Sequence, residues 1–135
     1  YTLSLAEAVA AGGYDWVNSN VTETNFPRTG KTGSVDLDTE LFHFNRNISS
    51  EDAVKEMAKK GFRPATIWEL LAFGANPKYR ELQRQFPIVA LGSSCIVRLN
   101  RHVPYLLGGG SERGVVLSVW AGGWFGDDRF LGVRN

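Results

Sequence analysis

The pattern of apolar residues changes at Pro87, and this change limits the folds that the chain can adopt. Before Pro87, two segments carry the start and stop signals of helices and are joined by a tight connection, Phe62–Pro64. After Pro87, short apolar runs alternate with glycine-rich breaks, as in a meander of short strands. These runs are Ile88–Leu91, Cys95–Val97, Val103–Leu107, Val115–Trp120 and Arg129–Val133. Helices followed by antiparallel strands predict an α+β domain, and not a parallel alternating one.

Two capping boxes mark helix starts in the first half of the chain. Ser4 and Glu7 have the spacing at which each side chain can bond the other residue's backbone, and Gly12–Gly13 ends this short helix. Thr66 and Glu69 repeat the spacing before a second apolar run. Both motifs predict where a helix begins.

The segment between these motifs predicts a strand and a further helix. Along Ser34–Asn45, one face of an alternating pattern holds Val35, Leu37 and Leu41, and the other holds Asp36, Asp38 and Glu40. This alternation is typical of a half-buried strand. Ser49 and two acidic residues then start a helix that Lys59–Gly61 closes, with an apolar stripe of Val54, Met57 and Ala58.

Length and charge exclude several classes of protein. At 135 residues, 43% of them hydrophobic, the chain has the size and composition of one domain, residues 1–135, that folds by itself. Its net charge of +1 is too small to steer a polyanion, so we expect no nucleic-acid partner. No apolar stretch reaches the roughly 20 residues of a membrane span, so we expect no membrane insertion.

The cysteine content and residues 1–30 give information about the cellular compartment of the protein. The lone Cys95 excludes an intramolecular disulfide and a disulfide-rich scaffold, which permits a reducing compartment. Residues 1–30 lack the charged start and apolar core of a secretory leader. We expect synthesis in the cytoplasm and leave the final location open, display on a cell surface or a virion included.

The residues that could carry catalysis are few. We place His43 within a strand and His102 in a loop before Pro104, and neither has the spacing of a zinc or Cys/His site. Cys95 opens a predicted strand, where a thiol behaves as a small buried hydrophobe. We therefore expect no enzyme activity, no metal and no cofactor.

The C-terminal third carries two glycine-rich stretches. Gly108–Ser111 lacks the lysine and spacing of a phosphate loop and predicts a hairpin loop. Trp120–Gly126 sets two tryptophans and a phenylalanine among residues with little or no side chain, which is poor patterning for a core. Rigid aromatic rings beside small residues are typical of binding surfaces. The alternative is that one tryptophan packs inward and the remainder forms a tight turn.

Asp127 and Asp128 follow this stretch and are a candidate acidic pair. Adjacent residues on a strand point to opposite faces, so the two carboxylates are not expected to share a metal ion. A solvated edge or a contact of a binding surface is the interpretation that we adopt.

Two motifs carry a resemblance to a known superfamily. The run Gly61–Gly74 resembles the second-helix motif of C-type lectin domains related to the formylglycine-generating enzyme, and Arg129–Arg134 resembles their closing strand. The resemblance implies a C-type lectin-like fold, with two main helices packed on short antiparallel strands.

Within that superfamily, the tryptophan-rich stretch before the closing strand is similar to the variable proteins of diversity-generating retroelements, in particular the archaeal, viral or candidate-phylum bacterial members. There, a reverse transcriptase copies a template with errors at adenines and overwrites the 3′ end of the gene. This implies a variable region near residues 115–135. The implied contact residues are Ser118, Trp120, Ala121, Gly123, Phe125, Asp127 and Asp128, and the implied scaffold residues are Leu117, Trp124, Phe130 and Val133.

The resemblance covers residues 49–135 and implies binding of a protein or other macromolecule, different for each gene copy. We expect a monomer. Two differences from the motifs of the superfamily argue against membership of two of its branches. The catalytic branch needs more cysteines than Cys95 alone, and the calcium-dependent sugar-binding branch needs a Glu-Pro-Asn or Gln-Pro-Asp motif and paired disulfides, which are missing. The alternatives are a related enzyme and an assembly module that uses the same aromatic patch.

Overall fold

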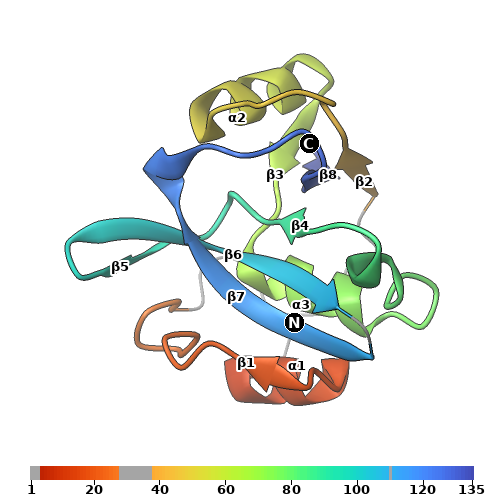
Figure 1. Cartoon of the computed structure of the whole chain (residues 1–135), viewed down its shortest axis with the longest axis vertical. Helices are drawn as coiled ribbons and strands as arrows, with labels where there is room; N and C mark the ends of the chain where they lie inside the picture. Colours follow the sequence, from red (N-terminus) through yellow and green to blue (C-terminus); the bar gives the residue numbers. More distant parts are fainter. Residues whose placement is uncertain (1–3, 28–37, 110) are drawn as a thin grey trace.

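The computed structural model describes residues 4–27, 38–109 and 111–135, and within them the helices and strands of an α+β domain (Figure 1). The helices are α1 (Leu5–Gly12), α2 (Ser50–Lys59) and α3 (Ile67–Ala75), with short 3-10 helices η1 (Leu82–Arg84) and η2 (Trp120–Gly122). The strands are β1 (Trp16–Val17), β2 (Thr39–Phe42), β3 (Phe62–Pro64), β4 (Ile88–Val89), β5 (Cys95–Val97), β6 (Asn100–Gly109), β7 (Glu112–Val119) and β8 (Arg129–Arg134). The predicted α+β class is confirmed.

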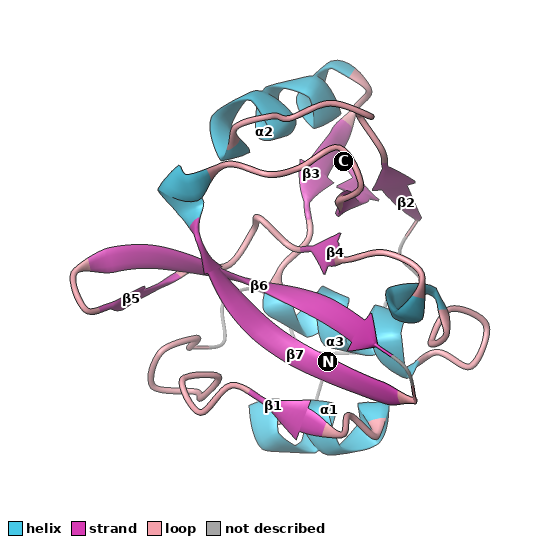
Figure 2. Ribbon diagram, viewed as in Figure 1, coloured by secondary structure: helices cyan, strands magenta, loops and turns pink. Residues whose placement is uncertain are grey.

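The strands join one mixed sheet in the order β1-β7-β6-β4-β8-β2, with β3 beside β8 and β5 beside β6 (Figure 2). The hairpin of β6 and β7 is the longest pairing. Gly108 and Gly109 of the predicted loop lie within β6, opposite Arg113 and Glu112, and Gly110 lies outside the described residues. Two pairings are parallel, β1 with β7 and β4 with β8. The predicted meander is therefore wrong. The long connection from β4 to β8, which contains β5, β6 and β7, allows β8 to pair parallel to β4.

The predicted helix starts are confirmed. Ser4 Oγ accepts the N–H of Glu7, whose carboxylate accepts the N–H of Ser4, and α1 ends at Gly13 in the left-handed region at φ 59°. Ser49 Oγ caps α2 by accepting the N–H of Asp52. Within the described residues, no helix has the length and apolarity needed to cross a membrane.

In the helical half, one local prediction is wrong and another holds only in part. Phe62–Pro64 is strand β3, antiparallel to β8, and not a plain connection. A three-residue strand that ends in proline has no alternating pattern to reveal it. On α2, the predicted apolar stripe holds for Met57, which is buried, and for Val54, which packs against the same cluster. Ala58 is exposed, and the second buried apolar residue is Ala53, four positions before Met57 on the same face.

The strand predicted at Ser34–Asn45 is observed over Thr39–Phe42, while Val35, Asp36 and Leu37 lie outside the described residues. Within the observed part, Glu40 is exposed, as predicted, and Leu41 is half-buried. The strand ends one residue before His43, so the prediction that His43 lies within a strand is wrong.

The core has one layer on each face of the sheet. Alternation along β4 and β8 sends Ile88 and Leu131 into a cluster with α1 and α3, and sends Val89 and Phe130 into a second cluster. This second cluster contains residues of α2 and also Trp124. The segment between β7 and β8 is therefore anchored in the core on the α2 side.

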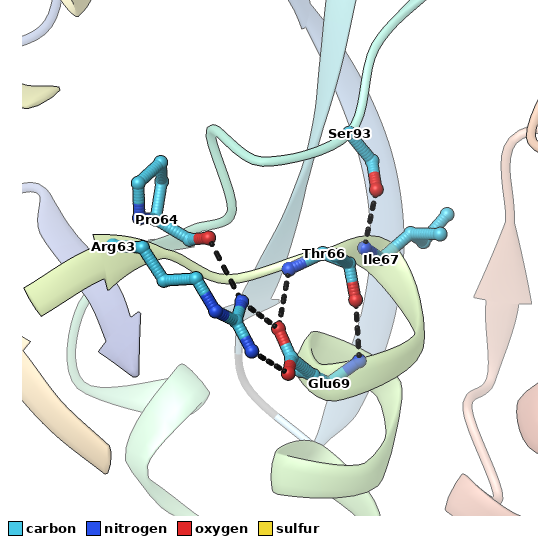
Figure 3. Close-up of polar contacts among 6 residues, drawn as sticks. All are labelled: Arg63, Pro64, Thr66, Ile67, Glu69 and Ser93. Atoms are coloured by element: carbon cyan, nitrogen blue, oxygen red, sulfur yellow. Dashed lines mark hydrogen bonds and ion pairs between the residues drawn. The ribbon is translucent and has the colours of Figure 1, made fainter. Parts of the chain in front are cut away.

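The start of α3 is fixed by an ion pair and by three hydrogen bonds from backbone N–H groups (Figure 3). Arg63 on β3 donates two hydrogen bonds to the Glu69 carboxylate, at 2.6 and 2.8 Å. Glu69 also accepts the N–H of Thr66, whose hydroxyl accepts the N–H of Glu69. Ser93, between β4 and β5, accepts the N–H of Ile67. Burial raises the pKa of Glu69, but the bonds from Arg63 and Thr66 outweigh it and hold that pKa below its usual value.

The C-terminal ends of α1 and α3 meet at Arg113, a buried residue at the start of β7. Its guanidinium donates to the carbonyl oxygens of Gly12, Gly74 and Arg80 at 2.7, 2.6 and 3.1 Å. Burial lowers the pKa of Arg113. Because helix C-termini carry partial negative charge, these carbonyl groups stabilise the buried cation and join both helices to the sheet.

Candidate binding site

The segment Trp120–Asp128, here called the aromatic loop, connects β7 to β8 beside the start of α2. Two backbone hydrogen bonds join it to the segment before α2, from Ile48 N–H to Trp124 O at 3.1 Å and from Trp124 N–H to Ile48 O at 2.9 Å. Trp124 is buried, with its ring against Tyr105 and Phe130. The alternative in which one tryptophan packs inward is thus confirmed for Trp124.

Ser50 and Glu51, at the start of α2, hold both tryptophans of the loop. The buried Ser50 hydroxyl donates to Trp120 O at 2.8 Å and accepts the indole N–H of Trp124 at 2.8 Å. Glu51 accepts the indole N–H of Trp120, and this bond lowers the pKa of Glu51. The Arg101 guanidinium lies 3.7 Å from the centre of the Trp120 ring. Trp120 is therefore fixed through its backbone, its N–H and its ring face.

The second half of the loop is a turn with its own contacts. The Asp128 carboxylate accepts the N–H of Phe125 at 2.9 Å, and burial raises the pKa of Asp128. His43 Nε2 donates to Gly126 O at 2.8 Å. Gly123 has φ 73° and ψ −179°, a conformation essentially confined to glycine. These features fix the course of the backbone around Phe125.

A shallow hollow of about 300 Å³ lies between the loop and the residues before α2. Its lining comprises Asn47, Ile48, Ser49, Gly122, Gly123, Trp124 and Phe125. Phe125 is 73% exposed at this rim. An exposed ring beside polar side chains and bare glycine backbone can bind another molecule by burying the ring and by hydrogen bonding to its rim.

The seven residues implied by the resemblance fall into three groups. Those with exposed side chains are Ala121, Phe125 and Asp127, and those half-buried are Ser118 and Trp120. Gly123 and the buried Asp128 instead determine the shape of the loop. Ser118 lies on β7 opposite Val103, so the two side chains share one face of the sheet. The other six of the seven residues lie in the aromatic loop.

The prediction that Asp127 and Asp128 are neighbours on a strand is wrong, because β8 begins at Arg129. Asp127 belongs to the turn and is exposed, while Asp128 is buried. Of the implied scaffold residues, Trp124, Phe130 and Val133 are buried and Leu117 is half-buried.

Sequence reasoning missed the residues that support the loop. Ser50, Glu51 and His43 precede it by about 70 to 80 residues, and no spacing motif relates them to it. Arg101 could have been found only from the register of β6 and β7, in which His102 lies opposite Val119. His102 itself lies on β6, so the predicted loop position is wrong.

Cys95 and His102 were considered above for catalysis, and the structure shows the surroundings of each. Burial raises the pKa of the Cys95 thiol, which disfavours the reactive thiolate. His102 Nδ1 lies 2.9 Å from Asn100 O. In the described part of the chain, no three His, Cys, Asp or Glu side chains gather as metal ligands.

Comparisons of the chain with family models, curated proteins and solved structures found no significant match. The functional conclusion therefore depends on the geometry of the aromatic loop and its supports.

Proposed function

We propose that this chain is a ligand-binding protein with a C-type lectin-like fold, whose C-terminal surface is diversified by a retroelement to bind different targets, chiefly proteins. One observation carries the proposal. Phe125 is exposed at the rim of a hollow, while the loop that presents it is held by contacts that do not involve its side chain. Such a surface can change its side chains without losing its shape.

The supports of the loop favour separation of folding from binding. The bonds from Ile48, Ser50 and His43 reach backbone atoms of the loop, and they remain possible whatever side chains stand at the exposed positions. Within the loop, the exposed positions are Ala121, Phe125 and Asp127, besides Gly122. We assign ligand contacts to these three residues, with Ser118 and Trp120 at the border.

A fixed loop also favours tight binding, because less conformational entropy is lost when a partner covers it. Burial of a phenylalanine side chain contributes about 1.5–3 kcal/mol. If a target covers Phe125, Phe125→Ala is expected to weaken binding by at least about tenfold, since tenfold in affinity is about 1.4 kcal/mol. Partners of this surface are expected to present an apolar patch for that ring.

The first test is the DNA that flanks the gene. We expect a near-copy of the codons for residues 115–135 beside a reverse transcriptase gene, with differences where the copy has adenine. The differing codons should fall at the exposed positions and spare Trp124 and Gly123. Absence of such a copy, or differences concentrated at Trp124, would contradict diversification.

The second test separates the surface from the scaffold. Phe125→Ala and Asp127→Ala should each change the free energy of unfolding by less than about 0.5 kcal/mol, as exposed substitutions usually do. Trp124→Ala, the matched buried change in the same loop, should lower it by about 3–5 kcal/mol. Urea unfolding measures all three. Loss of the fold on changing Phe125 would show that its ring supports the structure.

In the proposed function the protein acts as a monomer, which distinguishes it from an assembly module with the same aromatic patch. Its hydrodynamic size should stay constant as concentration rises. Growth of the particle with concentration, abolished by Phe125→Ala, would favour assembly instead.

A further inference from the structure

The hairpin of β5 and β6 projects from the body of the domain (Figure 1) and ends in a conformationally unfavourable turn. Val97 pairs with Asn100, so the loop consists of Arg98 and Leu99 alone. Both have positive φ, 51° and 71°. Two-residue hairpin loops with this backbone strongly prefer Asn-Gly, because a side chain such as that of leucine is strained there. Arg98 and Leu99 are therefore not residue types that stabilise this turn.

The tip of this hairpin is apolar and exposed. Leu99 is 95% exposed and Ile96, on β5, is 64% exposed. With Phe125 and Trp16 they are the large hydrophobic residues that the structure describes as exposed. An aliphatic side chain held outward in a strained turn is suited to insertion into a partner, because removal of its apolar surface from water favours association.

The charge of the hairpin has one sign. No Asp or Glu occurs from Pro87 to Ser111, whereas Arg98 and Arg101 are both exposed. Arg101 also stacks on Trp120, so the base of the hairpin adjoins the aromatic loop. Arg101 also lies near the Glu51 carboxylate, whereas Arg98 stands at the tip in a stretch without Asp or Glu, so the tip of the hairpin is complementary to an acidic surface.

We propose that the β5–β6 hairpin is a second contact element beside the aromatic loop, and that the target is a protein with an apolar depression rimmed by carboxylates. The inference rests on the proposed function and names the chemistry of its partner. Leu99 fills the depression, and Arg98 and Arg101 meet the carboxylates. A lipid surface is the weaker match, because anionic membranes are typically recognised by clusters of about four to eight basic residues.

The test uses a phage-displayed library of random peptides, selected on the immobilised full chain. We expect enriched peptides to combine a large apolar residue with Asp or Glu and to bind more weakly as salt increases. The informative variant carries Arg98→Asn together with Leu99→Gly. It gives the turn its preferred residues, so the protein should stay folded, with a midpoint of urea unfolding no lower than that of the original chain. Binding of the enriched peptides should nevertheless fall at least tenfold.

Two further variants, Glu112→Gln and Phe125→Ala, separate the possible results. Glu112→Gln, at the start of β7 and opposite Gly109 at the far end of β6, should leave peptide binding unchanged. Peptides that depend on Phe125 but not on Arg98 and Leu99 would overturn the hairpin inference and leave the proposed function standing. Peptides that depend on none of these residues, or failure to enrich any peptide, would overturn both.

The remaining results concern the charge and the class of partner. Enriched peptides without acidic residues would overturn the proposed chemistry. Leu99-dependent binding to phosphatidylcholine vesicles that contain phosphatidylserine, in the absence of peptide binding, would replace the protein partner with a membrane.

Discussion

Replacement of Ser50 by alanine is expected to destabilise the protein by much more than loss of one hydroxyl from its surface. The Ser50 hydroxyl is wholly buried, donates to Trp120 O and accepts the indole N–H of Trp124. Alanine fits the helix and the space but provides neither bond. The buried indole N–H of Trp124 is then left without its acceptor, and the backbone at Trp120 without its donor.

The expected loss of stability can be worked out from the buried indole N–H of Trp124. A buried polar group that loses its partner costs about 1–3 kcal/mol, so Ser50→Ala should lower the free energy of unfolding by about 2 kcal/mol. With an unfolding entropy of about 2.1 cal/mol/K per residue, about 2 kcal/mol corresponds to a fall in Tm of about 7 °C for a chain of this length. Ser19→Ala, an exposed serine, is the control and should change stability by less than about 0.5 kcal/mol.

A double-mutant cycle isolates the bond. Trp124→Phe keeps an aromatic ring in the core but removes the N–H, so Ser50→Ala should cost less in that background. The coupling energy from urea unfolding of the four proteins should be about 1 kcal/mol. A coupling energy near zero, with Ser50→Ala itself within the error of Ser19→Ala, would refute the role of Ser50 in holding the loop.

Three further predictions concern the backbone, the pH dependence and the buried cation, and urea unfolding measures each. Gly123→Ala should cost about 1–3 kcal/mol because of its positive φ, whereas Gly122→Ala, with no atom near the added Cβ, should be close to neutral; equal costs would contradict the strain. The folded pKa of Glu69 is lowered, so its contribution to stability is present above the unfolded value of about 4.5 and is lost as pH falls through the folded pKa. Glu69→Gln should therefore flatten the acid-side loss of stability, and an unchanged slope would contradict this. Arg113→Met should cost about 3 kcal/mol or more, since three carbonyl groups lose their donor, and a neutral effect would show that they find other partners.

The parts of the fold that were predictable carry local signals. The capping residues Ser4, Ser49 and Thr66 each bond the backbone within one turn, so their spacing is visible in the sequence. Strand pairing has no such signal. The parallel approach of β8 to β4 depends on where the chain returns after the β6–β7 hairpin, which no single segment determines. Strand β3 was missed because its three residues include Pro64 and are too few to alternate.

The candidate site was predictable only in its exposed half. The composition of Trp120–Gly126 indicated a surface with rings, and Phe125 is exposed there. Which tryptophan packs inward could not be decided from spacing, because the choice is made by Ser50 and the backbone of Ile48, remote in the sequence. The hairpin loop of Arg98 and Leu99 was likewise hidden, because these residue types are unusual in such turns.

Trp120 joins the two parts of the proposed surface. Its carbonyl group belongs to the Ser50 support, and its ring lies beneath Arg101 at the base of the hairpin. A change in the Trp120 side chain leaves the backbone bond intact but removes both the ring beneath Arg101 and the N–H bound by Glu51. The exposed residues of the loop can thus vary independently, whereas variation at Trp120 also alters the hairpin. Because the hairpin carries Arg98 and Arg101, we propose that Trp120 couples the apolar contacts of the loop to the charged contacts of the hairpin.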